Sequence, residues 1–206
     1  RVDTVLRTEL GVADGLADRR VRVLDPACGT GAYLVGVLDR IARTLREKGD
    51  DALLAADLKR AAVERVFGFE ILPASFVIAH LQVGLFLRQH GAALTAGSNE
   101  RAAIYLTNSL TDWAGPPEQI NIPFSELRRE REAAERVKRE EEILVILGNP
   151  PYDGYAGMAM GEERELVEAY RKTRRVPAPQ GQGLNDLYVR FFRVAERRIV
   201  EMTGKG

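Results

Sequence analysis

Cysteine and histidine are scarce in this sequence, which contains only Cys28, His80 and His90. A single cysteine cannot form a disulfide within the chain, so a reducing, cytoplasmic location fits the composition best. The three residues lie far apart and lack the spacing of zinc ligands, so we predict no metal site. The two histidines lie on or near an apolar helical stretch, where we expect them to pack or to face solvent.

The chain also lacks an excess of charge of either sign, with 30 Lys and Arg against 30 Asp and Glu. A zero net charge argues against a uniformly basic nucleic-acid-binding surface but leaves room for a local basic patch. The longest apolar stretch, PASFVIAHLQVGLFL (73–87), is interrupted by His80 and Gln82 and is too short to span a bilayer. We therefore expect no membrane association.

Short apolar runs alternate with stretches of helical periodicity along the 206 residues, which suffice for one domain. The apolar runs predict buried strands at 21–27, 65–71, 102–110 and 143–148. Helical spacing predicts helices at 32–49, 51–65, 73–89, 123–142 and 185–202. Continuous apolar strands are typical of a parallel sheet covered by helices on both faces. We therefore predict an α/β fold with a doubly wound, mostly parallel, Rossmann-like sheet.

Both ends of the chain suggest a part of a larger polypeptide. The sequence begins at Arg1 rather than at methionine, and it stops at EMTGKG. Four strands would leave a doubly wound sheet short on one side. We interpret 1–206 as an incomplete domain and expect the missing C-terminal strands after Gly206.

In open α/β sheets, ligands bind beyond the carboxyl ends of the strands. The first predicted strand ends in the loop Asp25-Pro26-Ala27-Cys28-Gly29-Thr30-Gly31. Its glycines permit a tight turn and a close backbone approach to a ligand. The loop lacks the Gly-Lys-Ser/Thr of a P-loop, and Asp25 suits a positively charged ligand better than a pyrophosphate. The alternative is a simple turn into the following helix.

The second and third predicted strands end in polar side chains. Glu70 ends the second strand, where an acid can bind ribose hydroxyls; alternatively, it only faces solvent. Asn108 ends the third strand, and its amide could recognise an adenine edge because it both donates and accepts. Asp112 is a weaker candidate for the same role. The alternative for Asn108 is capping of a local turn.

The fourth predicted strand ends in Asn149-Pro150-Pro151-Tyr152. The two prolines fix φ and remove two backbone donors, so the loop is stiff and its carbonyls are available as acceptors. Asn149 adds a side-chain acceptor, and Tyr152 adds a flat ring. Together these groups suit an aromatic amine, with two acceptors for its N–H groups and a ring for its base. A turn alone would explain neither Asn149 nor Tyr152.

DPACGTG, Glu70, TNSL and NPPY together resemble the motifs of S-adenosylmethionine-dependent DNA adenine-N6 methyltransferases, over residues 21–200. NDLYVRFFRVAERRI likewise resembles the helix that follows the catalytic loop in these enzymes. The motif order is similar to the gamma arrangement found in type I, Eco57I-like and type ISP restriction–modification enzymes. The resemblance implies the methyltransferase fold for 1–206, as a partial catalytic domain without a target-recognition domain.

The resemblance also implies residue roles. By this resemblance, the catalytic residues are Asn149, Pro150, Pro151 and Tyr152. The residues that bind S-adenosylmethionine are Asp25, Pro26, Ala27, Cys28, Gly29, Thr30, Gly31, Glu70, Ile71, Asn108, Ser109 and Leu110. Asn149 and the Pro150 carbonyl would accept the N6 hydrogens, while Tyr152 would stack on an adenine flipped out of double-stranded DNA. Cys28 would not act as a nucleophile. Expected partners are this DNA and further domains of the same polypeptide or restriction–modification subunits.

The sequence leaves two other functions open. Enzymes with a related Asn-Pro-Pro-aromatic loop methylate a glutamine amide in proteins or a guanine amine in RNA. The chain could instead be a cofactor-binding or scaffolding module of a restriction complex.

Two charged segments carry further predictions. We predict an exposed helix at 126–142. At 170–183 we predict a loop that either contacts phosphates or is simply solvated.

Overall fold

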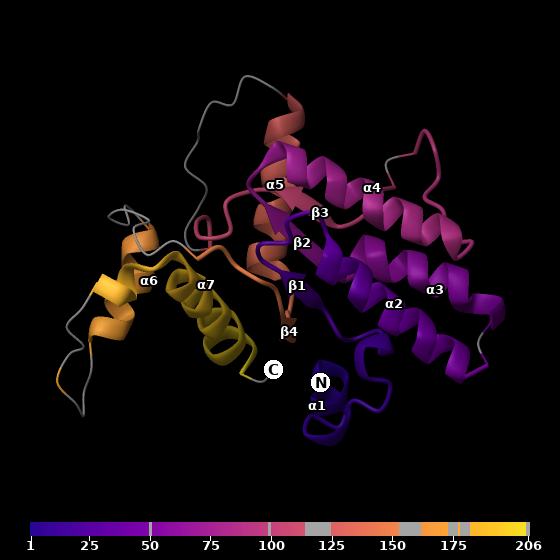
Figure 1. Ribbon diagram of the computed structural model, residues 1–206, viewed down its shortest axis with the longest axis horizontal. Helices are drawn as coiled ribbons and strands as arrows, with labels where there is room; N and C mark the ends of the chain where they lie inside the picture. Colours follow the sequence, from indigo (N-terminus) through magenta and orange to yellow (C-terminus); the bar gives the residue numbers. More distant parts are fainter. Residues whose placement is uncertain are drawn as a thin grey trace.

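The computed structural model describes residues 1–49, 51–98, 100–113, 125–152, 162–172, 177 and 182–204. Four parallel strands form one sheet in the order β3-β2-β1-β4 (Figure 1). Their bounds are β1 Val23–Asp25, β2 Val66–Glu70, β3 Ile104–Leu106 and β4 Val145–Ile146. The predicted α/β class with a parallel sheet is confirmed. Because the strand order reverses at β1, the carboxyl ends of β1 and β4 flank a topological switch point, where α/β sheets bind ligands.

Helices connect the strands and cover both faces of the sheet. Their bounds are α1 Val2–Thr8, α2 Ala32–Glu47, α3 Asp51–Glu64, α4 Pro73–Gln89, α5 Ser125–Glu140, α6 Glu162–Arg171 and α7 Leu187–Glu196, with the short segments η1 Gly15–Ala17, η2 Gln182–Asn185 and η3 Arg197–Thr203. Figure 1 shows α2, α3 and α4 grouped together beside the sheet, with α6 and α7 on the other side of the molecule.

The side chains of β2 alternate between two cores. Val66 packs into the core that includes α2, α3 and α4, whereas Phe67 and Phe69 pack into the core that includes Ala134 and Val137 of α5. This alternation is the period of two that a strand imposes, and both faces are apolar because both are covered. A sheet buried on both sides explains why the strand sequences are continuously apolar.

The strands are shorter than their apolar runs predict. The runs 102–110 and 143–148 yield only Ile104–Leu106 and Val145–Ile146 as strands. Apolar residues on either side, such as Ala102 and Ile143, are buried outside the paired strand residues. The last predicted helix is α-helical only to Glu196, after which Arg197–Thr203 continue as a π-helix.

The prediction of a solvent-exposed helix at 126–142 is wrong for one face of α5. Ala134, Glu135, Val137 and Lys138 are buried there. The error has a physical cause: opposite charges three or four residues apart resemble a solvated surface. In the structure some of these charges, such as Arg131 and Lys138, also contact Asp112 of the loop after β3. Within the described ranges, no helix has the length and apolar character needed to cross a membrane.

Candidate active site

A pocket of about 570 Å³ opens at the carboxyl ends of the strands. Its walls come from the loop after β1, the end of β2, the loop after β3 and the loop after β4. Ten of the residues assigned from the sequence line it together: Pro26, Ala27, Gly29, Glu70, Ile71, Asn108, Ser109, Leu110, Asn149 and Pro151. The volume lies within the range of small-molecule sites, roughly 300–1,000 Å³.

The glycine loop (25–31) turns the chain from β1 into α2. Gly29 and Gly31 adopt left-handed φ values of 55° and 88°, which favour glycine. A Cβ on Gly31 would also lie 3.2 Å from Ala79 of α4, whereas one on Gly29 would meet nothing within 4 Å. Gly31 therefore serves the turn and the helix packing, and Gly29 keeps the backbone open on the pocket side.

Glu70 lies at the end of β2 and is 8% exposed. Its Oε2 accepts a hydrogen bond from Gly29 N at 2.9 Å, and its Oε1 accepts from Ile71 N at 2.9 Å and Leu72 N at 2.8 Å. Three backbone donors thus orient the carboxylate in the pocket wall. A carboxylate can accept about four hydrogen bonds, so one acceptor position is left for a ligand hydroxyl.

Asp25 lies behind the pocket wall rather than in it. Its side chain is fully buried, Oδ1 accepts from Ala27 N at 3.1 Å, and Oδ2 has no hydrogen-bond partner within the described part of the chain. Burial, with a further contribution from the Glu70 charge, raises the pKa of Asp25 to about 7. The carboxyl group packs against Gly148, which lies between β4 and the NPPY motif, since a Cβ on Gly148 would lie 2.5 Å from Asp25 Oδ1.

Cys28 is buried between α2 and β2. A Cβ on Gly68 would lie 3.1 Å from its sulfur, and burial raises the pKa of the thiol above its usual range. A thiol held neutral is a poor nucleophile. Cys28, Thr30 and Gly31 shape the glycine loop without lining the pocket.

The β3 loop (107–113) forms the opposite wall. Asn108 Oδ1 accepts from Leu110 N at 2.9 Å, and Asn108 Nδ2 donates to Glu163 Oε1 at 3.2 Å. The Ser109 hydroxyl donates to the Pro26 carbonyl, which joins this loop to the glycine loop. Asn108 therefore caps its own turn and also lines the pocket, so the two interpretations of this residue are compatible.

The NPPY loop (149–152) leaves β4 toward the pocket. Asn149 and Pro151 line the pocket, while Pro150 and Tyr152 lie beside it. The Tyr152 side chain is 71% exposed, and its ring centroid lies 5.7 Å from that of Tyr188 on α7. Tyr188 in turn makes an edge contact with Phe192 at 6.1 Å. Tyr152, Tyr188 and Phe192 thus form a continuous group of aromatic rings next to the pocket-lining residue Pro151, and Tyr152 and Phe192 are exposed.

Four residues from α6 and α7 complete the pocket and were not found from the sequence: Glu163, Leu187, Arg190 and Phe191. Arg190 is 3% exposed and donates from Nη1 to Glu163 Oε2 at 2.9 Å. The same Glu163 accepts from Asn108, so it links α7 to the β3 loop. From the sequence, only the resemblance of the 185–199 helix to a family element was recognised, and that resemblance does not identify these contacts.

Two sequence-based expectations concern residues outside the pocket. Most of the basic loop 170–183 lies outside the described residues, since 173–176 and 178–181 are not described. The ring nitrogens of His80 and His90 contact the carbonyls of Ile104 at 3.2 Å and Phe86 at 2.9 Å. Both histidines pack against backbone, as expected.

Residues 15–193 match the family model for the DNA-methyltransferase domain of MmeI. Among curated proteins, the chain is 27% identical over 204 residues to the adenine-specific methyltransferase PglX of Streptomyces coelicolor (strain ATCC BAA-471 / A3(2) / M145). That alignment covers 90% of this chain and 16% of PglX. The chain therefore spans only a small part of the length of this relative.

Solved structures with a similar fold include two type ISP restriction–modification enzymes. The ATP-dependent type ISP enzyme LlaBIII bound to DNA gives a TM-score of 0.70 at 24% identity, covering 96% of this chain and 13% of that enzyme. A nuclease-deletion mutant of the type ISP enzyme LlaGI with a DNA substrate mimic gives 0.72 at 23% identity, covering 96% and 16%. The DrdV–DNA complex gives 0.64 at 24% identity, covering 96% and 18%. At these identities the comparison establishes a shared fold.

Proposed function

The chain belongs to the family of the MmeI DNA-methyltransferase domain, and on that basis we propose that it transfers a methyl group from S-adenosylmethionine to the exocyclic N6 amine of adenine in DNA. The observation that carries the proposal is the position of the NPPY loop (149–152). It ends β4 at the same pocket that Glu70 and the β3 loop line. On this proposal the acceptor site and the nucleoside site would be adjacent.

The residues present suit the adenosyl group of this cofactor. Glu70 offers a carboxylate to ribose hydroxyls, which is the usual role of an acid at the end of the second strand. Ile71, Leu110 and Phe191 offer apolar surface to a purine ring. The acidic residue in the pocket wall, Glu70, also favours a cationic ligand. When bound, S-adenosylmethionine would supply an electrophilic methyl group on its sulfonium sulfur.

The NPPY loop would hold and activate the acceptor. The lone pair of the adenine amine is delocalised into the ring, which makes the nitrogen a weak nucleophile. Asn149 Oδ1 and the Pro150 carbonyl would accept its two hydrogens and so stabilise positive charge developing on nitrogen. Because the prolines restrict the backbone, these acceptors are held in place before the substrate arrives.

Tyr152 would provide the stacking surface for the target base. An adenine inside a duplex cannot reach the pocket, so it must leave the stack. Tyr152 is mostly exposed beside the pocket entrance, where a flipped base would arrive. DNA, together with further domains or subunits of a restriction–modification system, is the partner that this chemistry requires.

The decisive experiment compares acceptors. The intact protein is incubated with S-adenosylmethionine labelled in the methyl group and with double-stranded DNA, ribosomal RNA or a protein release factor. We expect label in DNA only. Label in RNA or in a protein glutamine would contradict the proposal, and nucleoside binding without transfer to any acceptor would identify a non-catalytic module.

A further inference from the structure

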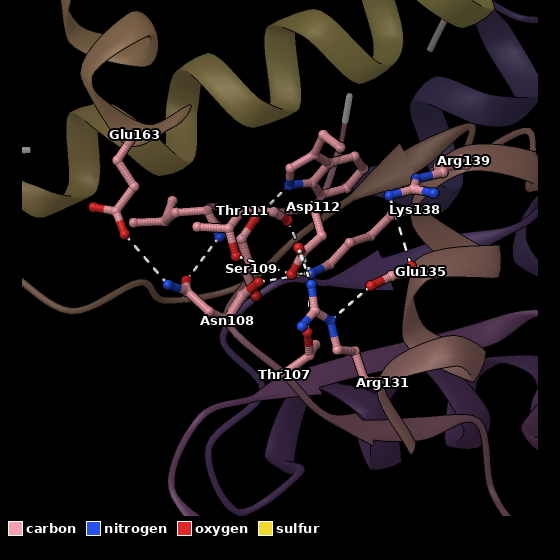
Figure 2. A network of polar contacts seen from close by, with 12 residues as sticks. Thr107, Asn108, Ser109, Thr111, Asp112, Arg131, Glu135, Lys138, Arg139 and Glu163 are labelled. Atoms are coloured by element: carbon pink, nitrogen blue, oxygen red, sulfur yellow. Dashed lines mark hydrogen bonds and ion pairs between the residues drawn. The ribbon is translucent and has the colours of Figure 1, made fainter. Parts of the chain in front are cut away.

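Lys138 lies on α5 and is fully buried, at 0% exposure. Its ammonium group donates to Thr107 Oγ1 at 2.9 Å, to Asn108 O at 2.7 Å and to Thr111 O at 3.0 Å (Figure 2). All three acceptors belong to the β3 loop (107–113). The three acceptors equal in number the three N–H donors of an ammonium group, so a single side chain can hydrogen-bond three positions of the loop at once.

Other contacts from α5 reinforce this anchor. Arg131 donates to Asp112 Oδ1 at 2.9 Å and to Glu135 Oε1 at 2.7 Å. Asp112 has a left-handed φ of 64°, a conformation that residues other than glycine rarely adopt. Its other carboxylate oxygen lies 4.0 Å from Lys138 Nζ. Two cations on α5 thus hold the end of the loop in a backbone conformation that it would not favour alone.

The same loop also lines the pocket. Asn108, Ser109 and Leu110 contribute to the pocket wall, and the Ser109 hydroxyl donates to the carbonyl of Pro26 in the glycine loop. Lys138 does not line the pocket; it bonds the backbone carbonyl of Asn108 and the hydroxyl of Thr107, a residue that also lines the pocket. The position of the pocket-lining side chains therefore depends on a residue that does not itself line the pocket.

We propose that Lys138 is a positioning residue, which holds the β3 loop in the conformation that binds the adenosyl part of the cofactor. This inference rests on the proposed function for the identity of the ligand. Loss of the ammonium group would leave two backbone carbonyls and a hydroxyl without their buried donor, and such groups reorganise to regain hydrogen bonds. The loop would then populate other conformations, and the ligand would have to select the competent one.

Binding measurements on the intact protein test this directly. Lys138→Met keeps a long apolar stem and removes the donors, while Arg129→Met removes an exposed charge from the same helix as a matched control. We expect Lys138→Met to raise the Kd of both S-adenosylmethionine and S-adenosylhomocysteine ~10-fold or more, by the same factor. The factor is the same because both carry the adenosyl group, whereas only one carries the sulfonium charge. Arg129→Met should leave both Kd values unchanged.

Two further measurements separate positioning from a general loss of stability. In Lys138→Met, hydrogen exchange should accelerate at 107–113 while the amides of β1 stay protected. At saturating cofactor, kcat should stay within ~3-fold of wild type while the KM for cofactor rises. Thr107→Val removes one acceptor and keeps the side-chain shape, which covers the case in which Lys138→Met does not fold. Because Thr107 also lines the pocket, its readout is hydrogen exchange at 107–113, which should accelerate to a smaller extent than in Lys138→Met.

An unchanged Kd for both nucleosides in Lys138→Met would overturn the inference. Hydrogen exchange that accelerates equally throughout the chain in Lys138→Met would overturn it as well. The outcome for the proposed function is separate. A wild-type protein that binds both nucleosides but does not methylate DNA would contradict the proposed function, while the effect of Lys138 on nucleoside affinity would stand.

Discussion

Glu70 Oε2 accepts a hydrogen bond from the backbone N–H of Gly29 at 2.9 Å, across 41 positions of sequence. Through Oε1 the same carboxylate accepts from Ile71 N and Leu72 N, where the chain enters α4. One buried side chain thereby joins the glycine loop, the end of β2 and the start of α4. The acid that would bind ribose also determines the shape of the loop beside it.

Glu70→Gln should therefore weaken both the fold and the cofactor site. A glutamine side chain must turn its NH₂ group toward at least one of the backbone donors, which breaks that hydrogen bond. We expect the free energy of unfolding to fall by about 1–3 kcal/mol, measured by urea denaturation, and the Kd for S-adenosylmethionine to rise ~10-fold. Glu64→Gln, at an exposed position ending α3, is the control and should change neither. A less stable variant with unchanged Kd would limit Glu70 to a structural role.

The contact between Gly148 and Asp25 should make the NPPY loop sensitive to one methyl group. In Gly148→Ala, the new Cβ would lie 2.5 Å from Asp25 Oδ1, and because the Asp25 side chain is fully buried, we expect the NPPY loop to shift. A displacement near 1 Å at an active site costs roughly 100-fold in rate, and we expect kcat to fall by that order. Gly84→Ala on α4, where a Cβ meets nothing within 4 Å, should instead gain about 0.5–1 kcal/mol of stability. Wild-type kcat in Gly148→Ala would contradict the packing described.

The pKa of Asp25, raised from 3.8 to about 7 by burial and by the Glu70 charge, predicts a pH effect on stability. The folded state holds the proton more tightly than the unfolded chain, so the contribution of Asp25 is complete below about pH 4 and is lost as the pH rises to 7. Asp25→Asn mimics the neutral carboxyl group. The variant should match wild type near pH 4 and exceed its free energy of unfolding by roughly 3–4 kcal/mol at pH 8.

Denaturation curves of Asp25→Asn and wild type across this pH range provide the measurement. A constant difference between Asp25→Asn and wild type from pH 4 to pH 8 would show that Asp25 is ionised in the folded state throughout.

Tyr152 should act through its ring rather than its hydroxyl group. Stacking of one base on an aromatic side chain contributes ~1–3 kcal/mol, so Tyr152→Ala should raise the KM for DNA between ~5-fold and ~150-fold. Tyr152→Phe keeps the ring and should stay near wild type. Fluorescence of 2-aminopurine at the target position would report the flipped base. Equal losses in the two variants would argue against stacking.

The strand ends were predictable because each carries a local signal. Continuous apolar runs mark strands of a sheet buried on both faces, and the chemistry-bearing residues Glu70, Asn108 and Asn149 follow them directly. A parallel sheet brings all such ends to one edge. The glycine loop was recognisable for the same reason, since its turn requires φ values that favour glycine.

The contacts that hold these residues in place were not predictable, because they join segments that are distant in the sequence. Lys138 belongs to a run of alternating charges, and nothing local distinguishes it from the exposed Arg129 on the same helix. Arg190 and Glu163 form their ion pair across 27 positions. Asp25 illustrates the converse: its motif was recognised, but its complete burial depends on the fit of Gly148 against it.

Methyl transfer by wild type and by Asn149→Ala provides the most direct test of the proposed chemistry. Duplex DNA is incubated with the intact protein and S-adenosylmethionine, digested to nucleosides and analysed by mass spectrometry. We expect N6-methyldeoxyadenosine from wild type and a fall in kcat of ~100–1,000-fold in Asn149→Ala, with the Kd for S-adenosylmethionine nearly unchanged. Wild-type turnover by Asn149→Ala, or methylation at any other position of the DNA, would contradict the role assigned to the NPPY loop.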